Sequence, residues 1–231
     1  MQWTVTFTSP ATVYDIDGFD NPAATVTRLH RLRRHVVCYI NVGSWEDWRP
    51  DAGSLPKSVL GKVYPGYPDE RYLDIRRLAI LQPIMARRFR MCRAKGFDAI
   101  APDNIDTFQA DTGFHLTAAD ELAYISWLIR EAHGLGLSIG QKNNGDQTSA
   151  LEPVMDWALT EECFFGQFCD QFTAYPAHHK RLFNTEYLED TTRATFRLYC
   201  GEDAKFYHFA MGLKPVALTP WRMGCNGVAK R

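Results

Sequence analysis

The sequence lacks the patterns that mark membrane proteins and nucleic-acid-binding domains. No apolar run approaches the length of a membrane-spanning helix, and no signal peptide is visible at the N-terminus. Lys and Arg number 26 against 27 Asp and Glu, so the chain has no basic excess of the kind that nucleic-acid-binding domains carry. We therefore expect neither a membrane nor a nucleic acid as partner.

Motifs for several kinds of catalysis are also missing. The chain holds no CxxC pair, no HExxH, no GxSxG elbow and no glycine-rich phosphate loop after its first strands. We therefore expect no metal and no cofactor. A magnesium or calcium site is the main rival, because YDID (14–17) and PDNID (102–106) group oxygen ligands of the kind these ions prefer.

The six cysteines predict two disulfides. Cys163 and Cys169 are six residues apart across an expected loop, and Cys200 can reach Cys225 near the C-terminus. Cys38 lies within the apolar run HVVCYI and is expected to be a buried thiol. The alternative is six reduced thiols in a cytosolic protein.

Short β-branched or aromatic runs recur along the chain, and several carry apolar residues on both faces, as parallel strands covered by helices do. The strands that we expect are 3–7, 12–17, 35–42, 97–103, 137–143, 156–162, 181–187 and 205–211.

Helices are expected between most of these strands. One begins with Asn21 as N-cap and Pro22 at its first position, and a long one runs from Asp74 to Gly96. Thr117 begins another, with a capping box to Asp120, and shorter helices are expected near 147–153, 170–178 and 190–200. The alternation predicts an α/β fold, a single (β/α)8 TIM-type barrel domain over 1–231, irregular at its first strands.

Polar and acidic side chains follow almost every expected strand. The carboxyl ends of barrel strands meet at one mouth, where such enzymes keep their active sites. The alternative is that Asp and Asn only form turns there. The residues in these positions are Asp15, Asp17, Asn41, Trp45, Glu46, Asp47, Arg49, Asp51, Asp103, Asn104, Asp106, Lys142, Asn143, Asn144, Asp146, Glu161, Glu162, Glu186 and Tyr187.

Two carboxylates at such a mouth suit the hydrolysis of a glycosidic bond. One carboxyl must protonate the leaving oxygen, and a second must attack the sugar or activate water. Asp103 and Glu161 are the candidates, because each ends an otherwise apolar strand. The alternative for either one is a structural salt bridge to Lys142 or Arg49.

Several long motifs then match a known family in the right order. They are CYINVGSWEDWRPD (38–51), PDERYLDIR (68–76), KGFDAIAPDNID (95–106), TGFHLTAADELAY (112–124), AHGLGLSIGQKNN (132–144) and TEECF (160–164). With these motifs the sequence resembles glycoside-hydrolase family 114, the endo-α-1,4-polygalactosaminidase family. Glu162 departs from that pattern, since family members usually carry Gln there.

The resemblance implies a barrel enzyme that cuts α-1,4-linked galactosamine polymers at internal bonds. The family's paired carboxylates fall on Asp103 and Glu161. By analogy with other barrel glycosidases, we expect Asp103 to be the nucleophile and Glu161 the acid, with retention of configuration. Many relatives are secreted, so an extracellular protein is expected. The rival readings are a barrel that binds a cationic glycan without cleaving it, and a metal-dependent hydrolase.

A deacetylated galactosamine polymer is cationic, and an acidic mouth would attract it. Lys142 is expected to keep Asp103 ionised. Tyr39, Trp45, Trp48 and Tyr187 are expected to stack on sugar rings, with packing in the core as the alternative for each. The predicted substrate-binding set is Asp17, Tyr39, Trp45, Glu46, Asp106, Lys142, Asn143, Glu186 and Tyr187. The partner is a cationic galactosamine-containing polysaccharide, bound by a monomer.

Overall fold

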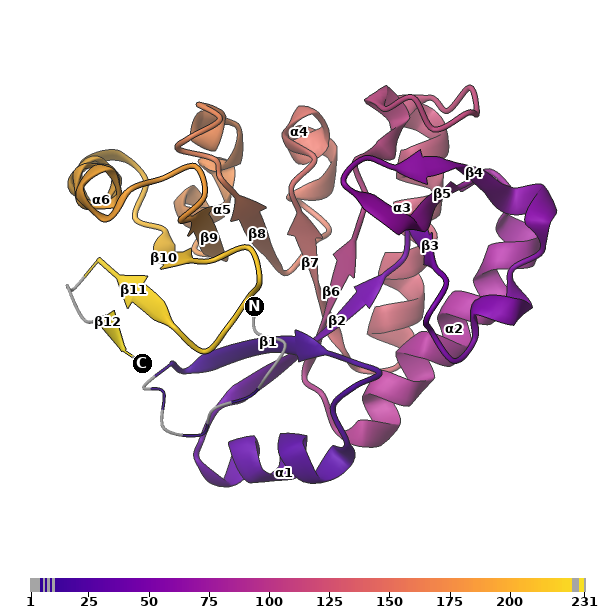
Figure 1. Ribbon diagram of the computed structural model, residues 1–231, viewed down its shortest axis with the longest axis horizontal. Coiled ribbons are helices and arrows are strands. Elements are labelled where there is room, and N and C mark those ends of the chain that lie inside the picture. Colours follow the sequence, from indigo (N-terminus) through magenta and orange to yellow (C-terminus); the bar gives the residue numbers. More distant parts are fainter. Residues whose placement is uncertain (1–4, 6, 8, 10, 226–228, 231) are drawn as a thin grey trace. The chain divides into compact units, whose positions relative to one another are not determined.

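The computed structural model describes residues 5, 7, 9, 11–225 and 229–230 (Figure 1). The chain folds into two compact units, residues 17–139 (the first unit) and residues 1–16 with 140–231 (the second unit). Strands and helices alternate along both units, and the predicted α/β fold of TIM-barrel type is confirmed. Most of the strand expected at 3–7 lies outside the described residues.

The first unit is built on parallel strands. β1 (Val13–Asp17) leads into it, followed by α1 (Ala23–Arg31), β2 (His35–Asn41), α2 (Leu78–Lys95), β6 (Ala99–Asp103) and α3 (Ala118–Gly134). β2 pairs with β6, so that Asn41 lies opposite Asp103, and β6 pairs with the start of β7 (Ser138–Lys142). Helix α2 contacts both α1 and α3 (Figure 1).

The helix ends in this unit partly follow the predictions. The capping box of Thr117 and Asp120 and the left-handed Gly96 that ends α2 are confirmed. The cap of α1 is wrong by one residue, because Pro22 is the N-cap and the Asn21 amide donates to the Asp17 carbonyl instead.

The predicted start of α2 at Asp74 is also wrong, since the helix begins at Leu78. The Asp74 carboxylate binds Arg76, and its N–H donates to the Val59 carbonyl. These contacts hold Asp74 in a turn, so its carboxylate does not cap the helix.

A small antiparallel sheet between β2 and α2 was not predicted. It consists of β3 (Ser44–Glu46), β4 (Leu60–Tyr64) and β5 (Tyr67–Leu73), with β5 in the middle. The N–H of Leu73 donates to the carbonyl of Gly43 at 3.0 Å, which fixes the sheet to the chain just after β2.

The second unit continues the parallel pattern. The end of β7 pairs with β8 (Trp157–Glu161), β8 with β9 (Arg181–Tyr187) and β9 with β10 (Ala210–Lys214). Two further strands, β11 (Arg222–Gly224) and β12 (Ala229–Lys230), are antiparallel and were not predicted. Its helices are α4 (Thr148–Leu151), α5 (Ala174–Ala177) and α6 (Arg193–Phe206).

The strand predicted at 205–211 is wrong. Helix α6 continues to Phe206, and β10 begins only at Ala210. The carboxylate of Asp203 accepts a hydrogen bond from the N–H of Phe209, which fixes the chain where it leaves the helix. The apolar run therefore straddles a helix end, and its composition alone does not show this.

Three disulfides join all six cysteines. Cys163–Cys169 and Cys200–Cys225 confirm the predicted pairs, with Cα atoms 4.8 and 5.4 Å apart. The prediction of a free thiol at Cys38 is wrong, because a bond to Cys92 ties β2 to α2. In the described part of the chain, no helix is both long and apolar enough to cross a membrane.

Candidate functional site

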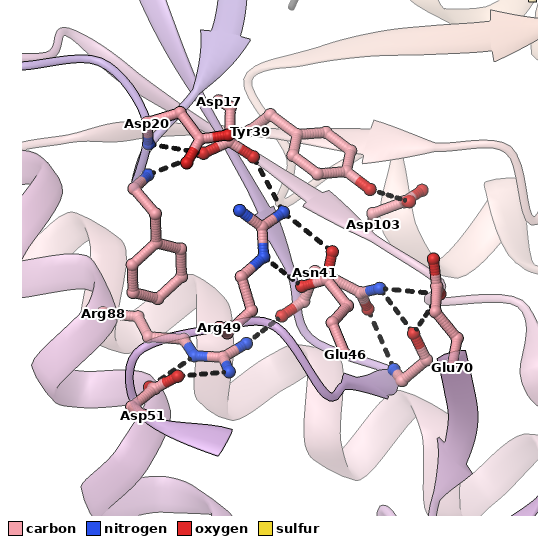
Figure 2. A network of polar contacts seen from close by, with 12 residues as sticks. Asp17, Asp20, Tyr39, Asn41, Glu46, Arg49, Asp51, Glu70, Arg88 and Asp103 are labelled. Atoms are coloured by element: carbon pink, nitrogen blue, oxygen red, sulfur yellow. Dashed lines mark hydrogen bonds and ion pairs between the residues drawn. The ribbon is translucent and has the colours of Figure 1, made fainter.

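Asp103 ends β6 and is held by a tyrosine on the neighbouring strand. Tyr39 lies on β2 two residues before Asn41, the residue opposite Asp103, so the side chains of Tyr39 and Asp103 share one face of the sheet. The Tyr39 hydroxyl donates to Oδ2 of Asp103 at 2.5 Å (Figure 2). Burial, together with the charge of Asp103, raises the pKa of Tyr39 well above its usual value, so the hydroxyl keeps its proton and acts as a donor.

A second group of polar side chains fixes the loop that follows Asp103. Asn104 donates to Asn41 and to Ser44, both at 3.2 Å, and Ser44 in turn donates to Glu70 at 2.8 Å. A Cβ on Gly43 would lie 1.7 Å from the Asn104 carbonyl oxygen, so only glycine allows this approach. The β2–β3 connection and the start of the 104–112 loop thus hold each other.

The Glu70 carboxylate interacts with several members of this group. Burial raises its pKa to about 7; the hydrogen bond from Ser44 lowers it, and the charges of Glu46 and Asp103 raise it further. Glu70 therefore lies close to Asp103, and near neutral pH its charge varies.

Arg49 neutralises two carboxylates that the sequence placed in the substrate-binding set. Its guanidinium binds both oxygens of Glu46 at 2.7 Å and reaches Asp17 at 2.8 Å (Figure 2). All three side chains are less than 5% exposed. Their contacts are those of a buried ion-pair network, because each charge already has its counter-ion.

A second buried arginine, Arg88 on α2, holds the end of β2. Arg88 donates to both carboxylate oxygens of Asp51 at 2.9 Å and to the backbone carbonyl of Asn41 at 2.7 Å. Its guanidinium also lies 5.3 Å from the centre of the Phe19 ring. The carbonyl at the end of β2 is therefore held in place by an arginine whose charge is itself paired.

The other predicted residues of the first unit differ in exposure. Asp106 is exposed at the start of the turn Thr107–Gln109. Trp45 alternates with Ser44 and Glu46 along β3, so it points to the opposite face, and its indole N–H donates to the Ala52 carbonyl. The contact of Trp45 stabilises the loop after β3.

In the second unit Glu161 ends β8 and is held by three donors. The hydroxyl of Tyr187 on β9 donates to Oε1, and the ammonium of Lys142 on β7 lies 2.8 Å from Oε2. The Asn143 amide reaches Oε2 at 3.5 Å, while its oxygen accepts from the N–H of Glu161 at 2.9 Å. Lys142 is thus paired with Glu161, and its predicted action on Asp103 stays a prediction.

Left-handed backbone follows β6, β7 and β8 in turn. Asn104, Asn143, Asn144 and Glu162 all have φ between 49° and 60°. Asn tolerates this conformation, whereas Glu rarely adopts it. Strain of this kind gathers at functional sites, where side chains must be aimed in one direction.

Glu186 and Glu162 both lie near Glu161, but the surroundings of their carboxyl groups differ. Glu186 is fully buried and accepts from the N–H groups of Phe164 and Phe165, so it fixes the loop after β8. Burial, followed by the charges of Asp190 and Glu186, raises the pKa of Glu162 to about 7.

The sequence missed residues that support the ends of β2 and β6 around Asp103. Ser44 accepts from Asn104 and donates to Glu70. Arg88 donates to the carbonyl of Asn41, the residue opposite Asp103. Ser44, Glu70 and Arg88 lie far from Asp103 in sequence, and only the fold brings them to this region. Within the described residues, no group of three His, Cys, Asp or Glu side chains is arranged to hold a metal ion. The chemistry open to these residues is that of two separately held carboxylates.

Comparisons with known proteins agree with this chemistry. The model of glycoside-hydrolase family GH114 matches residues 2–230. The crystal structure of Aspergillus fumigatus Ega3 in complex with galactosamine is 33% identical, with a TM-score of 0.91 over 97% of this chain and 92% of that one. No curated protein sequence was found to match the chain.

Two more distant structures share the fold. The glycoside hydrolase domain of PelA from Pseudomonas aeruginosa is 14% identical, with a TM-score of 0.67 over 89% of this chain and 88% of that one. Isomaltulose synthase from Erwinia rhapontici is 8% identical, with a TM-score of 0.54 over 76% of this chain and 50% of that one.

Proposed function

The chain belongs to glycoside-hydrolase family GH114 and is a glycosidase, and on this premise we propose that it hydrolyses α-1,4-linked galactosamine polymers at internal bonds. Asp103 and Glu161 are the two catalytic carboxylates. The observation that carries this assignment is their common setting: each ends a parallel strand and accepts a hydrogen bond from a tyrosine on a neighbouring strand.

The substrate class is supported by a relative and by charge. Ega3, at 33% identity, was solved with galactosamine bound. The amino group of that sugar is a cation when it is not acetylated, and Asp103 and the exposed Asp106 offer it carboxylates in the first unit. Asp17 and Glu46 contribute less, because Arg49 already neutralises them.

The mechanism uses the two carboxyl groups in sequence. Asp103 attacks the anomeric carbon while Glu161 gives its proton to the leaving glycosidic oxygen, so that an ester to Asp103 forms as the bond to that oxygen breaks. Glu161, now a carboxylate, takes a proton from water. The water oxygen displaces Asp103 from the anomeric carbon, and the configuration is retained.

Lys142 assists the step in which Glu161 loses its proton. An ammonium 2.8 Å away stabilises the carboxylate that Glu161 becomes after the leaving group departs.

We also propose that the chain is a secreted monomer with one catalytic domain. The family match covers both units, and disulfides persist in oxidising compartments outside the cytosol. The three disulfides of this chain therefore fit secretion.

The decisive experiment is incubation with galactosamine polymers of defined acetylation. Mass spectrometry should show oligosaccharides of many lengths, as expected for cleavage at internal bonds, and proton NMR should show the anomeric configuration of the substrate in the first product. Asp103→Asn and Glu161→Gln should each abolish cleavage. Asp156→Asn, just before the start of β8 and so at the far end of that strand from Glu161, is the matched control and should cleave normally.

Three outcomes would contradict the proposal. Polymer that is bound but never cleaved would indicate a binding protein. Cleavage that stops with a chelator would indicate a metal-dependent hydrolase. A product of inverted configuration would agree with the proposed substrate but would exclude Asp103 as the nucleophile.

A further inference from the structure

Three tyrosines of the β4–β5 hairpin lie next to one another in the first unit. The ring of Tyr64 lies 4.7 Å from that of Tyr72 and 6.0 Å from that of Tyr67, which meets it edge-on. Tyr72 is buried, whereas Tyr67 is 50% exposed. The aromatic group therefore runs from the interior of the small sheet to the solvent.

This aromatic group begins beside the candidate nucleophile. The Tyr64 hydroxyl donates at 3.1 Å to the side-chain oxygen of Asn104, the residue directly after Asp103. Burial raises the pKa of Tyr72, and the charges of Asp106 and Asp111 raise it further, so both carboxylates act electrostatically on its hydroxyl. The Tyr64–Asn104 hydrogen bond thus joins the ring group to the start of the acidic 104–112 loop.

The catalytic mechanism uses none of these rings. Tyr67, the outer ring, is half exposed and so contributes little to the core. We propose that Tyr64 and Tyr67, with Asp106 of the adjoining loop, form a further subsite that binds one cationic aminosugar residue of the polymer, beyond the residue attacked by Asp103. This proposal rests on the proposed function, which supplies the polymer.

The chemistry of a cationic sugar fits both parts of the surface. An ammonium group over a tyrosine ring is attracted by the negative face of the ring, and the apolar face of a sugar packs against the same ring. The exposed Asp106 carboxylate, two residues after the Asn104 that binds Tyr64, adds a charge of opposite sign. A polymer bound at Asp103 would then be held at a second point, which favours long chains over short ones.

The test measures binding rather than cleavage. Isothermal titration calorimetry on the full chain carrying Asp103→Asn uses an α-1,4-galactosamine octasaccharide, the matching disaccharide and the fully N-acetylated octasaccharide. The added substitutions are Tyr67→Ala, Tyr67→Phe and Val63→Ala. Val63 lies on the same strand as Tyr64 and is also 50% exposed, but it has no aromatic ring, so it is the matched control.

We expect Tyr67→Ala to weaken binding of the galactosamine octasaccharide about two- to fivefold, the loss that one exposed cation–π contact predicts. Tyr67→Phe keeps the ring and should restore the affinity. Val63→Ala should bind like its parent. The advantage of the octasaccharide over the disaccharide should shrink only in Tyr67→Ala.

The other outcomes separate the two proposals. If Tyr67→Ala and Val63→Ala bind the octasaccharide equally well, this hairpin holds no subsite. The proposed substrate would not be contradicted by that result. If Tyr67→Ala weakens binding of the acetylated octasaccharide as much as binding of the cationic one, the subsite does not recognise the ammonium group. If the parent binds none of the oligosaccharides, the proposed substrate is wrong and the subsite falls with it.

Discussion

The hydroxyl of Tyr39 on β2 donates a 2.5 Å hydrogen bond to the carboxylate of Asp103 on the adjacent strand β6. The same relationship recurs in the second unit, where Tyr187 on β9 donates to Glu161 on β8. Both tyrosines were predicted to stack on sugar rings, but both are less than 10% exposed. We infer that their main contribution is to aim the two carboxylates.

Tyr39→Phe is expected to lower kcat by about ten- to hundredfold, since hydrogen bonds to charged groups contribute roughly 1.5–3 kcal/mol. The phenylalanine ring fills the same space, so the fold should persist. KM should change little, because the lost bond orients the nucleophile and does not bind the sugar. Steady-state kinetics on a defined galactosamine oligosaccharide measures both constants.

Tyr124→Phe is the matched control for this prediction. Tyr124 is as buried as Tyr39, but its hydroxyl donates to the backbone carbonyl of Val42 at 2.9 Å. The two variants should lose similar stability in urea denaturation while only Tyr39→Phe loses activity. An equal loss of kcat in both variants would show that Tyr39 acts through stability alone.

The positions of Asp103 and Glu161 were predictable because they depend on local patterns. Each follows an apolar run of strand length, and the chain alternates strands with helices. The ends of these strands can therefore be located from the sequence. The capping box at Thr117 and the stop at Gly96 are equally local. Local sequence patterns therefore predict most of the order of strands and helices in both units.

What the sequence did not reveal depends on contacts between distant residues. Cys38 lies in an apolar strand and Cys92 in a helix 54 residues later, so neither spacing nor composition pairs them. The β3–β5 sheet was missed because β3 has only three residues and the centre of β5 is the polar run Pro68 to Arg71. Glu46 and Asp17 read as free acids until the fold places Arg49 between them.

Arg49→Met is expected to destabilise the chain by about 3–5 kcal/mol, because it leaves Asp17 and Glu46 buried without a counter-ion. The free energy of unfolding, measured in urea, reports the loss. Arg90→Met is the control: its pair with Glu131 is at the surface and 3.5 Å long, and its removal should cost less than about 1 kcal/mol. Similar losses in both variants would mean that water or substrate reaches the Arg49 network.

The three disulfides are expected to contribute unequally to stability. Loop-closure entropy predicts about 4 kcal/mol for Cys38–Cys92 and about 2 kcal/mol for Cys163–Cys169, because the first closes the longer loop. Their sequence separations are 54 and 6. Chains with both cysteines of one pair replaced by alanine should show this order in thermal denaturation. The reverse order would indicate that contacts in the loop after β8, rather than chain entropy, govern the effect of Cys163–Cys169.

The buried carboxyl of Glu121 should make stability depend on pH. Its Oε1 accepts from the N–H and the hydroxyl of Thr107, while no described group hydrogen-bonds to Oε2. Burial raises its pKa from 4.5 to about 7; the Thr107 bonds lower it, and the charge of Asp106 raises it. Glu121 therefore keeps its proton in the folded chain at a pH where the unfolded chain has lost it.

The sign of the effect follows from proton binding. Between pH 4.5 and 7 the folded state binds more protons at Glu121 than the unfolded state does, so the free energy of unfolding falls as the pH rises through this window. The expected total is on the order of 3 kcal/mol for this one group. Urea denaturation at pH 4.5 and pH 8 measures it. Glu121→Gln should flatten the difference, whereas Thr107→Val, which removes one donor to the carboxylate, should steepen the decline. Parallel pH profiles for all three proteins would show that Glu121 is ionised in the folded chain across the whole range.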